Sequence, residues 1–191
     1  MKKRPITLLD LGGVVFQSTG QSNATIDWAI ITALNHQYGH ALNIGEDRFP
    51  DFLQDYNQQT QQVLSGPEFL RAVFDTLAIN QPLIDWLRQR SEIIIVSDNY
   101  RENIAYISER YKFHEWASQQ IYSFDYRMVK ADARFFAQLI EDLPDYSIEE
   151  MIFIDDSIHK IESAAQHGIR GILYQSNEQL FRDYEAGHFH L

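Results

Sequence analysis

The sequence predicts an α/β protein with a doubly wound parallel sheet and an inserted helical segment. Five short apolar runs alternate with helical patterns, which is typical of parallel strands whose crossover helices cover both faces of a sheet. Residues 16–81 show helical patterns and no strand pattern. Several of the runs end in aspartate or serine, and parallel strands bring such ends to one edge. The apolar runs are residues 6–9, 93–96, 121–124, 151–154 and 171–174.

Composition limits the classes of partner and chemistry. The chain has 191 residues, 45% of them hydrophobic and 23% charged, which suits one globular domain with a small insertion. A formal net charge of −11 argues against nucleic acid and against an anionic membrane surface as partners. There is no cysteine, which excludes disulfides, thiolate chemistry and Cys-based zinc sites. The basic N-terminus precedes too short an apolar run for a signal peptide or a membrane span. A reducing cytosol fits, and we expect a cytoplasmic protein.

The first strand carries the first chemical signal. Its apolar run begins at Ile6 and ends at Asp10, and Gly12 and Gly13 follow, so it reads as a parallel strand that opens into a tight turn. Ligands bind at the carboxyl edge of open α/β sheets. Asp10 is therefore a candidate metal ligand, nucleophile or both. The alternative is that Asp10 only caps the turn.

Three helices are predicted in the segment 16–81 from apolar periodicity and end signals. The third opens with a capping box, in which Ser65 and Glu68 satisfy each other's backbone N–H groups. The predicted helices run from a cap at Ser22 or Asn23 to Gly39, over residues 47–56, and onward from Ser65.

The segment 16–81 directly follows the Asp10 strand, so we expect it to be a helical cap over that edge. The remaining residues, 1–15 and 82–191, then form the α/β core. An ordinary set of core helices is the alternative. After Pro82 the helical patterns alternate with the remaining strands. These helices are predicted at residues 83–90, 104–111, 131–141 and 157–166, with a last one capped by Ser176.

Two further strands end in polar groups suited to phosphate and cation chemistry. Ser97 ends one strand, and the backbone N–H groups of the turn behind it are suited to phosphate oxygens. Asp155 and Asp156 end another, and adjacent carboxylates repel each other unless a cation lies near. With Asp10 they supply the hard oxygen ligands that Mg²⁺ prefers. Helix capping by Asp156 or by the next residue is the alternative. Lys130 is a candidate to neutralise both phosphate and aspartate, although a lone lysine is usually solvated surface.

Taken in order, these landmarks closely resemble the motifs of the haloacid dehalogenase (HAD) superfamily, which consists mostly of Mg²⁺-dependent phosphatases. The resemblance covers nearly the whole chain, and four motifs in the right order make it specific. The insertion resembles the small α-helical cap of the family's sugar-phosphate phosphatases and epoxide-hydrolase phosphatase domains. The matching stretches are Asp10-Leu11-Gly12-Gly13-Val14-Val15, Ser97, Lys130 in 128–136, and Phe153-Ile154-Asp155-Asp156.

The resemblance implies a Rossmann-like core and a role for each motif. Asp10 would be the nucleophile that forms an aspartyl-phosphate, with Lys130 as its catalytic partner. Ser97, Asp98 and Lys130 would bind the phosphate. The implied Mg²⁺ ligands are Asp10, Gly12, Asp155 and Asp156. We therefore expect an Mg²⁺-dependent hydrolase of a small phosphorylated metabolite, with sugar phosphates among the candidates.

Two positions depart from the family pattern. The family's phosphatases usually carry a second aspartate, a general acid and base, where this chain has Gly12, and a proline where it has Ala131. A subgroup resembling this chain also has Asp-Leu-Gly and includes sugar-phosphate phosphatases. A catalytically silent binding protein and a hydrolase of non-phosphate chemistry are the alternatives. A receiver domain would carry its acidic pair after the first strand. Candidate substrate contacts, by charge alone, are His36, His40, Arg48 and Arg71.

Overall fold

The computed structural model describes residues 4–191, and its core is a five-stranded parallel sheet with the order β5-β4-β1-β6-β7. Leu9 of β1 lies opposite Ile95 on one side and Ile154 on the other, so the carboxyl ends of the three central strands are level. The predicted α/β fold with a parallel sheet is confirmed. The strands are β1 (Ile6–Leu9), β4 (Glu92–Ser97), β5 (Gln119–Tyr122), β6 (Met151–Asp155) and β7 (Arg170–Leu173).

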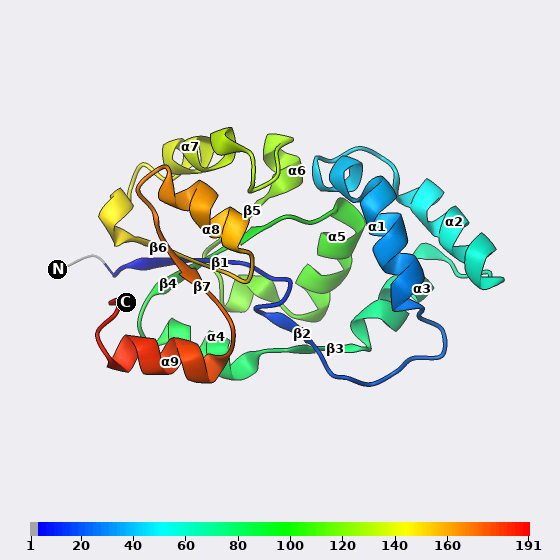
Figure 1. Ribbon diagram of the computed structural model, residues 1–191, viewed down its shortest axis with the longest axis horizontal. Helices are drawn as coiled ribbons and strands as arrows, with labels where there is room; N and C mark the ends of the chain where they lie inside the picture. Colours follow the sequence, from blue (N-terminus) through cyan, green and yellow to red (C-terminus); the bar gives the residue numbers. More distant parts are fainter. Residues whose placement is uncertain (1–3) are drawn as a thin grey trace.

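Helices cover both faces of this sheet (Figure 1). Side chains alternate between the faces along each strand: Leu9 and Ile95 pack in one buried cluster, whereas Leu8 and Ile94 pack in the other. The sheet is therefore doubly wound, as predicted. On the Leu9 face lie α4 (Gln81–Arg88), α5 (Arg101–Arg110) and α9 (Asn177–Glu185), and on the Leu8 face lie α7 (Ala133–Asp142) and α8 (Ile158–Ala165).

Short helical turns complete the core, and one of them shortens a predicted strand. β5 ends at Tyr122, and α6 (Ser123–Tyr126) begins where the sequence pattern predicts a strand to residue 124. The backbone N–H of Tyr122 donates to Asp125 Oδ2 at 3.1 Å, and this helix-start contact ends the strand. The 3₁₀ turns are η1 (Phe113–Glu115) and η2 (Ile148–Glu150).

Three helices of the segment 16–81 share a hydrophobic cluster of their own, in which Phe52, Tyr56 and Phe69 are buried. The predicted capping box of α3 forms, with the backbone N–H of Ser65 donating to Glu68 Oε2 at 2.9 Å. The helices are α1 (Trp28–Asn43), α2 (Phe49–Thr60) and α3 (Gly66–Phe74), and they lie beyond α5 in Figure 1.

The ends predicted for α1 are wrong. Its N-cap is Asp27, whose carboxylate accepts from two backbone N–H groups, whereas Asn23 accepts from Thr25 N in a preceding turn. The helix also continues past Gly39 to Asn43. A glycine inside a helix costs only about 1 kcal/mol, and burial of Leu42 in the next turn offsets it.

An antiparallel ribbon occupies the two ends of the segment 16–81, where no strand is predicted. β2 (Phe16–Ser18) pairs with β3 (Leu77–Ile79) between the sheet and the three helices (Figure 1). Strands of three residues are too short to display an alternating pattern. The division of the chain into a core and a cap stays a prediction.

Within residues 4–191, no helix combines the length and apolar character needed to cross a membrane.

Candidate active site

Three neighbouring strands bring polar side chains to one edge of the sheet. Asp10 directly follows β1, while Ser97 and Asp155 are the last residues of β4 and β6, which flank β1. The backbone N–H of Asp10 donates to the carbonyl oxygen of Ile154 at 3.1 Å and extends the strand pairing by one residue. The structure therefore places these three predicted site residues at the same edge.

Lys130 lies fully buried beneath this edge and joins two of the aspartates. Its Nζ lies 2.7 Å from Asp10 Oδ1 and 2.6 Å from Asp155 Oδ2, and it donates to the carbonyl oxygen of Val96 at 3.0 Å. An ammonium group has three N–H donors, so all of them are used. The backbone N–H of Lys130 donates to Asp98 Oδ1 at 2.8 Å, which holds its loop against β4.

The charges of this cluster are set by burial and by one another. Burial acts to raise the pKa of Asp10, but the charges of Lys130 and Lys160 outweigh it and hold that pKa below its usual range. Burial raises the pKa of Asp155 to about 6, with Lys130 opposing the change and Asp10 adding to it. Burial acts to lower the pKa of Lys130, but the neighbouring carboxylates raise it above its usual range. Asp10 is therefore held as a carboxylate next to a charged lysine.

The three carboxylates at the edge form a candidate metal centre. Asp10, Asp155 and Asp156 each offer one oxygen, and these atoms lie within 4.8 Å of one another. Asp10 and Asp155 are buried while Asp156 is exposed, so the cluster opens to solvent on one side. An all-oxygen set with room for further ligands fits a hard cation such as Mg²⁺.

Gly13 makes the close packing of this centre possible. Its φ is +73°, and a Cβ built on it would lie 2.1 Å from Asp156 Oδ2. Any side chain here would both strain the backbone and displace the carboxylate. The second glycine of the predicted motif is therefore required by Asp156.

Solved structures with a similar fold include HAD-family hydrolases. No protein-family model matches the sequence, and a comparison with curated proteins finds no match. Among solved structures, a HAD-family enzyme from Bacteroides thetaiotaomicron has a TM-score of 0.71 at 18% identity, over 95% of this chain and all of that chain. A predicted HAD-like hydrolase from Porphyromonas gingivalis has a TM-score of 0.70 at 17% identity, over 96% of this chain and 97% of that one. The chain has the HAD fold.

A second crystal structure of the Bacteroides enzyme, in complex with magnesium and inorganic phosphate, matches with a TM-score of 0.69 at 18% identity. It covers 94% of this chain and all of that chain. Asp10, Ser97, Lys130 and Asp155 thus meet within a HAD fold.

Two predicted phosphate ligands lie where β4 of the HAD core ends: Ser97 is its last residue, and Asp98 follows it. Ser97 is buried, and its Oγ lies 3.5 Å from the carbonyl oxygen of Asp98. The carboxylate of Asp98 is engaged by the Lys130 loop, so a phosphate contact at Asp98 has to come from its backbone N–H. Phosphate binding by Ser97, Asp98 and Lys130 stays a prediction, as does the metal role of Gly12.

Lys160 is a site residue that the sequence analysis missed. Its Nζ lies 3.6 Å from Asp98 Oδ2, 3.8 Å from Asp10 Oδ2 and 3.9 Å from Asp155 Oδ2. It stands in the first turn of α8, just after Asp155 at the end of β6 and Asp156, which follows it. Helical side chains lean toward the N-terminus of their helix, so a lysine at this position points back at those aspartates. The short spacing between Asp156 and Lys160, at the start of a predicted helix, is the feature of the sequence that could have identified Lys160.

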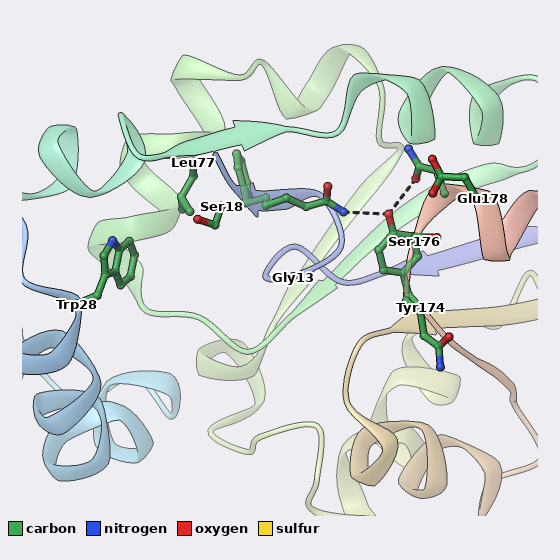
Figure 2. A pocket seen from close by; sticks show the side chains of 11 residues that line it. Gly13, Ser18, Trp28, Leu77, Tyr174, Ser176 and Glu178 are labelled. Carbon is green, nitrogen blue, oxygen red and sulfur yellow. Dashed lines mark hydrogen bonds between the residues drawn. The ribbon is translucent and has the colours of Figure 1, made fainter. Parts of the chain in front are cut away.

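Two cavities border this edge of the HAD core at Gly13. The larger, of about 680 Å³, runs along the β2–β3 ribbon from Gly13 to the loop after β7, with Trp28 at the far side in Figure 2. At its floor, Gln17 Nε2 donates to the hydroxyl of Tyr174, which donates to Asn177 Oδ1. The smaller cavity, of about 250 Å³, lies between Gly12 and the helical insertion. Its lining is apolar apart from Tyr100, Asn35, Asn99 and Asn103.

The four residues suggested by charge are placed differently. His40 lines a third cavity, of about 560 Å³, which also borders Asp98. Arg48 pairs with Asp51 at 3.1 Å and Arg71 with Asp75 at 3.8 Å, both on the helical insertion. His36 is exposed on α1.

Proposed function

We propose that the protein is an Mg²⁺-dependent phosphatase that hydrolyses a small organic phosphomonoester through an aspartyl-phosphate on Asp10. The observation that carries this proposal is the ionised Asp10, held by Lys130 at 2.7 Å, within a group of carboxylates whose oxygens lie within 4.8 Å. The HAD fold and the magnesium and phosphate bound to the Bacteroides enzyme support it. The substrate class we expect is small phosphorylated metabolites, sugar phosphates among them.

Asp10, Asp155 and Asp156 would hold Mg²⁺, with the carbonyl of Gly12 as the further predicted ligand. When bound, the cation offsets the repulsion between a carboxylate and an approaching phosphate dianion. Lys130 fixes Asp10 Oδ1 and so orients the attacking carboxylate.

The reaction then has two steps. In the first, an oxygen of Asp10 forms a bond to phosphorus, and the bond from phosphorus to the substrate oxygen breaks. The leaving oxygen keeps the bonding electron pair and takes a proton from solvent water, which gives the free alcohol. In the second, a water oxygen attacks phosphorus and loses a proton to solvent, the bond from phosphorus to the Asp10 oxygen breaks, and inorganic phosphate leaves while the carboxylate of Asp10 is restored. Lys130 keeps its charge throughout, because the buried aspartates hold its pKa high.

A catalytically silent binding protein remains the second candidate because of Gly12. The position that usually carries the family's general acid has no side chain here, while the residues that would bind metal and phosphate are present. A silent protein would bind Mg²⁺ and a phosphorylated ligand without turnover.

The test is a hydrolysis screen over a panel of phosphomonoesters with Mg²⁺. We expect release of inorganic phosphate that falls to background in EDTA and in Asp10→Asn, which keeps the shape of the side chain and removes the attacking oxygen. Asp85→Asn, on the exposed face of α4, is the matched control and should retain wild-type rates. Turnover by Asp10→Asn, or full activity in EDTA, rules out this mechanism. Binding without turnover of any monoester supports the silent protein instead.

A further inference from the structure

The two lysines of the site are held in different ways. Lys130 is 0% exposed, and its three N–H donors are taken by Asp10, Asp155 and the Val96 carbonyl. With these three contacts in place, Lys130 has no N–H donor left for a further acceptor. Lys130 therefore holds the two aspartates firmly, and its predicted contact with phosphate requires it to exchange one of these partners.

Lys160 is held loosely. Its side chain is 23% exposed, and its Nζ lies 3.6–3.9 Å from three carboxylate oxygens. Hydrogen bonds from N–H to oxygen span roughly 2.7–3.2 Å, so these contacts are ion pairs without close hydrogen bonds. The ammonium of Lys160 therefore keeps donors for a stronger acceptor, and a short movement of its flexible chain is enough to use them.

The position of Lys160 is unfavourable unless the site requires it. A positive charge in the first turn of a helix opposes the helix dipole, which favours negative charge there. The nearby carboxylates of Asp10, Asp98 and Asp155 offset this cost. Together these carboxylates carry more negative charge than Lys130, the other lysine among them, can balance, so a second positive charge is favoured here.

We propose that Lys160 is a second lysine, beside Lys130, that contacts the phosphoryl group of the substrate, and that it balances the site's carboxylates when no metal or phosphate is bound. This inference rests on the proposed function, since it adds Lys160 to the residues expected to bind the phosphate. Lys160 and Mg²⁺ would both neutralise the negative charge of Asp10 and Asp155, so they compete for it. The lysine therefore weakens the binding of the metal alone and strengthens the binding of phosphate once the metal is present.

The test compares Lys160→Met with Lys160→Arg and with Lys112→Met, a matched loss of charge at an exposed lysine that pairs with Glu115. Calorimetry measures the affinity for MgCl₂ alone and for inorganic phosphate at saturating Mg²⁺. A charge-assisted contact with phosphate is worth about a tenfold to hundredfold change in affinity. In Lys160→Met we expect phosphate to bind at least tenfold more weakly and Mg²⁺ alone to bind severalfold more tightly. Lys160→Arg should stay close to the wild type in phosphate affinity, and Lys112→Met should match the wild type in both.

The outcomes separate this inference from the proposed function. Unchanged phosphate affinity in Lys160→Met overturns the inference alone, because the wild-type protein still binds Mg²⁺ and phosphate as proposed. A wild-type protein that binds phosphate but hydrolyses no monoester overturns the proposed function alone. A wild-type protein that binds no phosphate in the presence of Mg²⁺ overturns both. Circular dichroism and thermal unfolding confirm that each variant is folded, and Lys160→Gln replaces Lys160→Met if the latter is not.

Discussion

Gly12 and Gly13 are neighbours with opposite tolerance for a side chain. Gly13 needs its positive φ and its missing Cβ, because Asp156 lies against it. Gly12 has no positive φ, and no atom of residues 4–191 outside its chain neighbours lies within 4 Å of the position of a Cβ. A side chain at Gly12 is therefore compatible with the fold, and it would enter the space beside the smaller cavity, which Gly12 lines.

Gly12→Asp should change which substrates are hydrolysed fastest. When the bond from phosphorus to oxygen breaks, negative charge grows on the leaving oxygen, and a positioned acid that protonates it contributes about 10²–10⁴-fold. Without this acid, the wild-type rate should fall steeply from aryl to alkyl phosphates, and Gly12→Asp should flatten the dependence. The measurement is kcat/KM across aryl and alkyl phosphates, with Gly12→Asn as the control of similar shape and no acid. An equally flat dependence in the wild type and in Gly12→Asp would show that another group supplies the proton.

Residue by residue, the site is predictable where the chemistry follows a strand end. Asp10, Asp155 and Asp156 stand at the ends of apolar runs, and the parallel sheet brings these ends together at one edge. Lys130 is not adjacent to a strand, so its charge makes it only one candidate among the lysines, and the resemblance to a family gives it a role in the site. Lys160 was missed because an isolated lysine on a helix is usually solvated, and its partners become visible only once strands β1, β4 and β6 are neighbours.

At the scale of elements, α7 depends on a side-chain cap. Asp132 Oδ1 accepts from the backbone N–H of Arg134 at 2.9 Å, and the guanidinium of Arg134 donates to both carboxylate oxygens. Phe135 and Phe136, in the first turn of α7, are fully buried in the core. The cap therefore anchors the helix that follows the Lys130 loop.

Asp132→Ala should destabilise the protein by about 1 kcal/mol, the usual cost of losing an N-cap. Hydrogen bonds from Arg134 lower the pKa of Asp132 to about 2, from 3.8 for a free aspartate. A lowered folded pKa means that the stabilisation is complete above pH 4 and is lost as pH falls toward 2. The variant should therefore differ most from the wild type at pH 7, and the difference should shrink as pH falls through 2. Urea unfolding across this range measures the difference, and Asp85→Ala, which caps no helix, is the control. An equal difference at pH 7 and at pH 2 would contradict the role of the charge.

Elements were predictable when their ends carry a side-chain signal. The capping box at Ser65 and the cap at Ser176 form as predicted, because each depends on residues a few positions apart. The prediction that α1 ends at Gly39 was wrong, because a glycine inside the helix is tolerated once Leu42 is buried against other helices. The β2–β3 ribbon was missed, because its pairing joins residues about sixty positions apart in strands of three. These outcomes depend on tertiary contacts that no local pattern contains.

At the scale of the whole molecule, the helical insertion touches the core at several points. Phe16 of the ribbon packs against Phe74 of α3 and Tyr111 of the core, with ring centroids 5.6 and 4.9 Å apart. Tyr100 of the core packs against Phe49 of α2 at 5.7 Å. The smaller cavity lies between these contacts, next to Gly12 and Gly13. The sequence predicts an insertion at this edge, but not which of its faces meets the core, because that depends on how α1, α2 and α3 pack together.

The last prediction concerns movement of this insertion. Closure over a bound phosphate would expel water and strengthen the electrostatic contacts of the site. The β2–β3 ribbon and the start of α4 at Gln81 link the insertion to the core, and the backbone N–H of Asn80 donates to the carbonyl oxygen of Val15 at 2.7 Å. Mg²⁺ with inorganic phosphate should therefore slow amide hydrogen exchange severalfold in residues 16–18 and 77–81. Amides of α7, which packs on the face of the sheet opposite to Phe16, serve as the internal reference and should exchange at the same rate in both states. A variant that combines Asp10→Asn, Asp155→Asn and Lys160→Met should bind phosphate more weakly, and its ribbon amides should show no slowing of exchange. If the ribbon amides exchange identically with and without ligand in the wild type, at a phosphate concentration where calorimetry shows binding, the insertion is a fixed part of the fold and no lid closes.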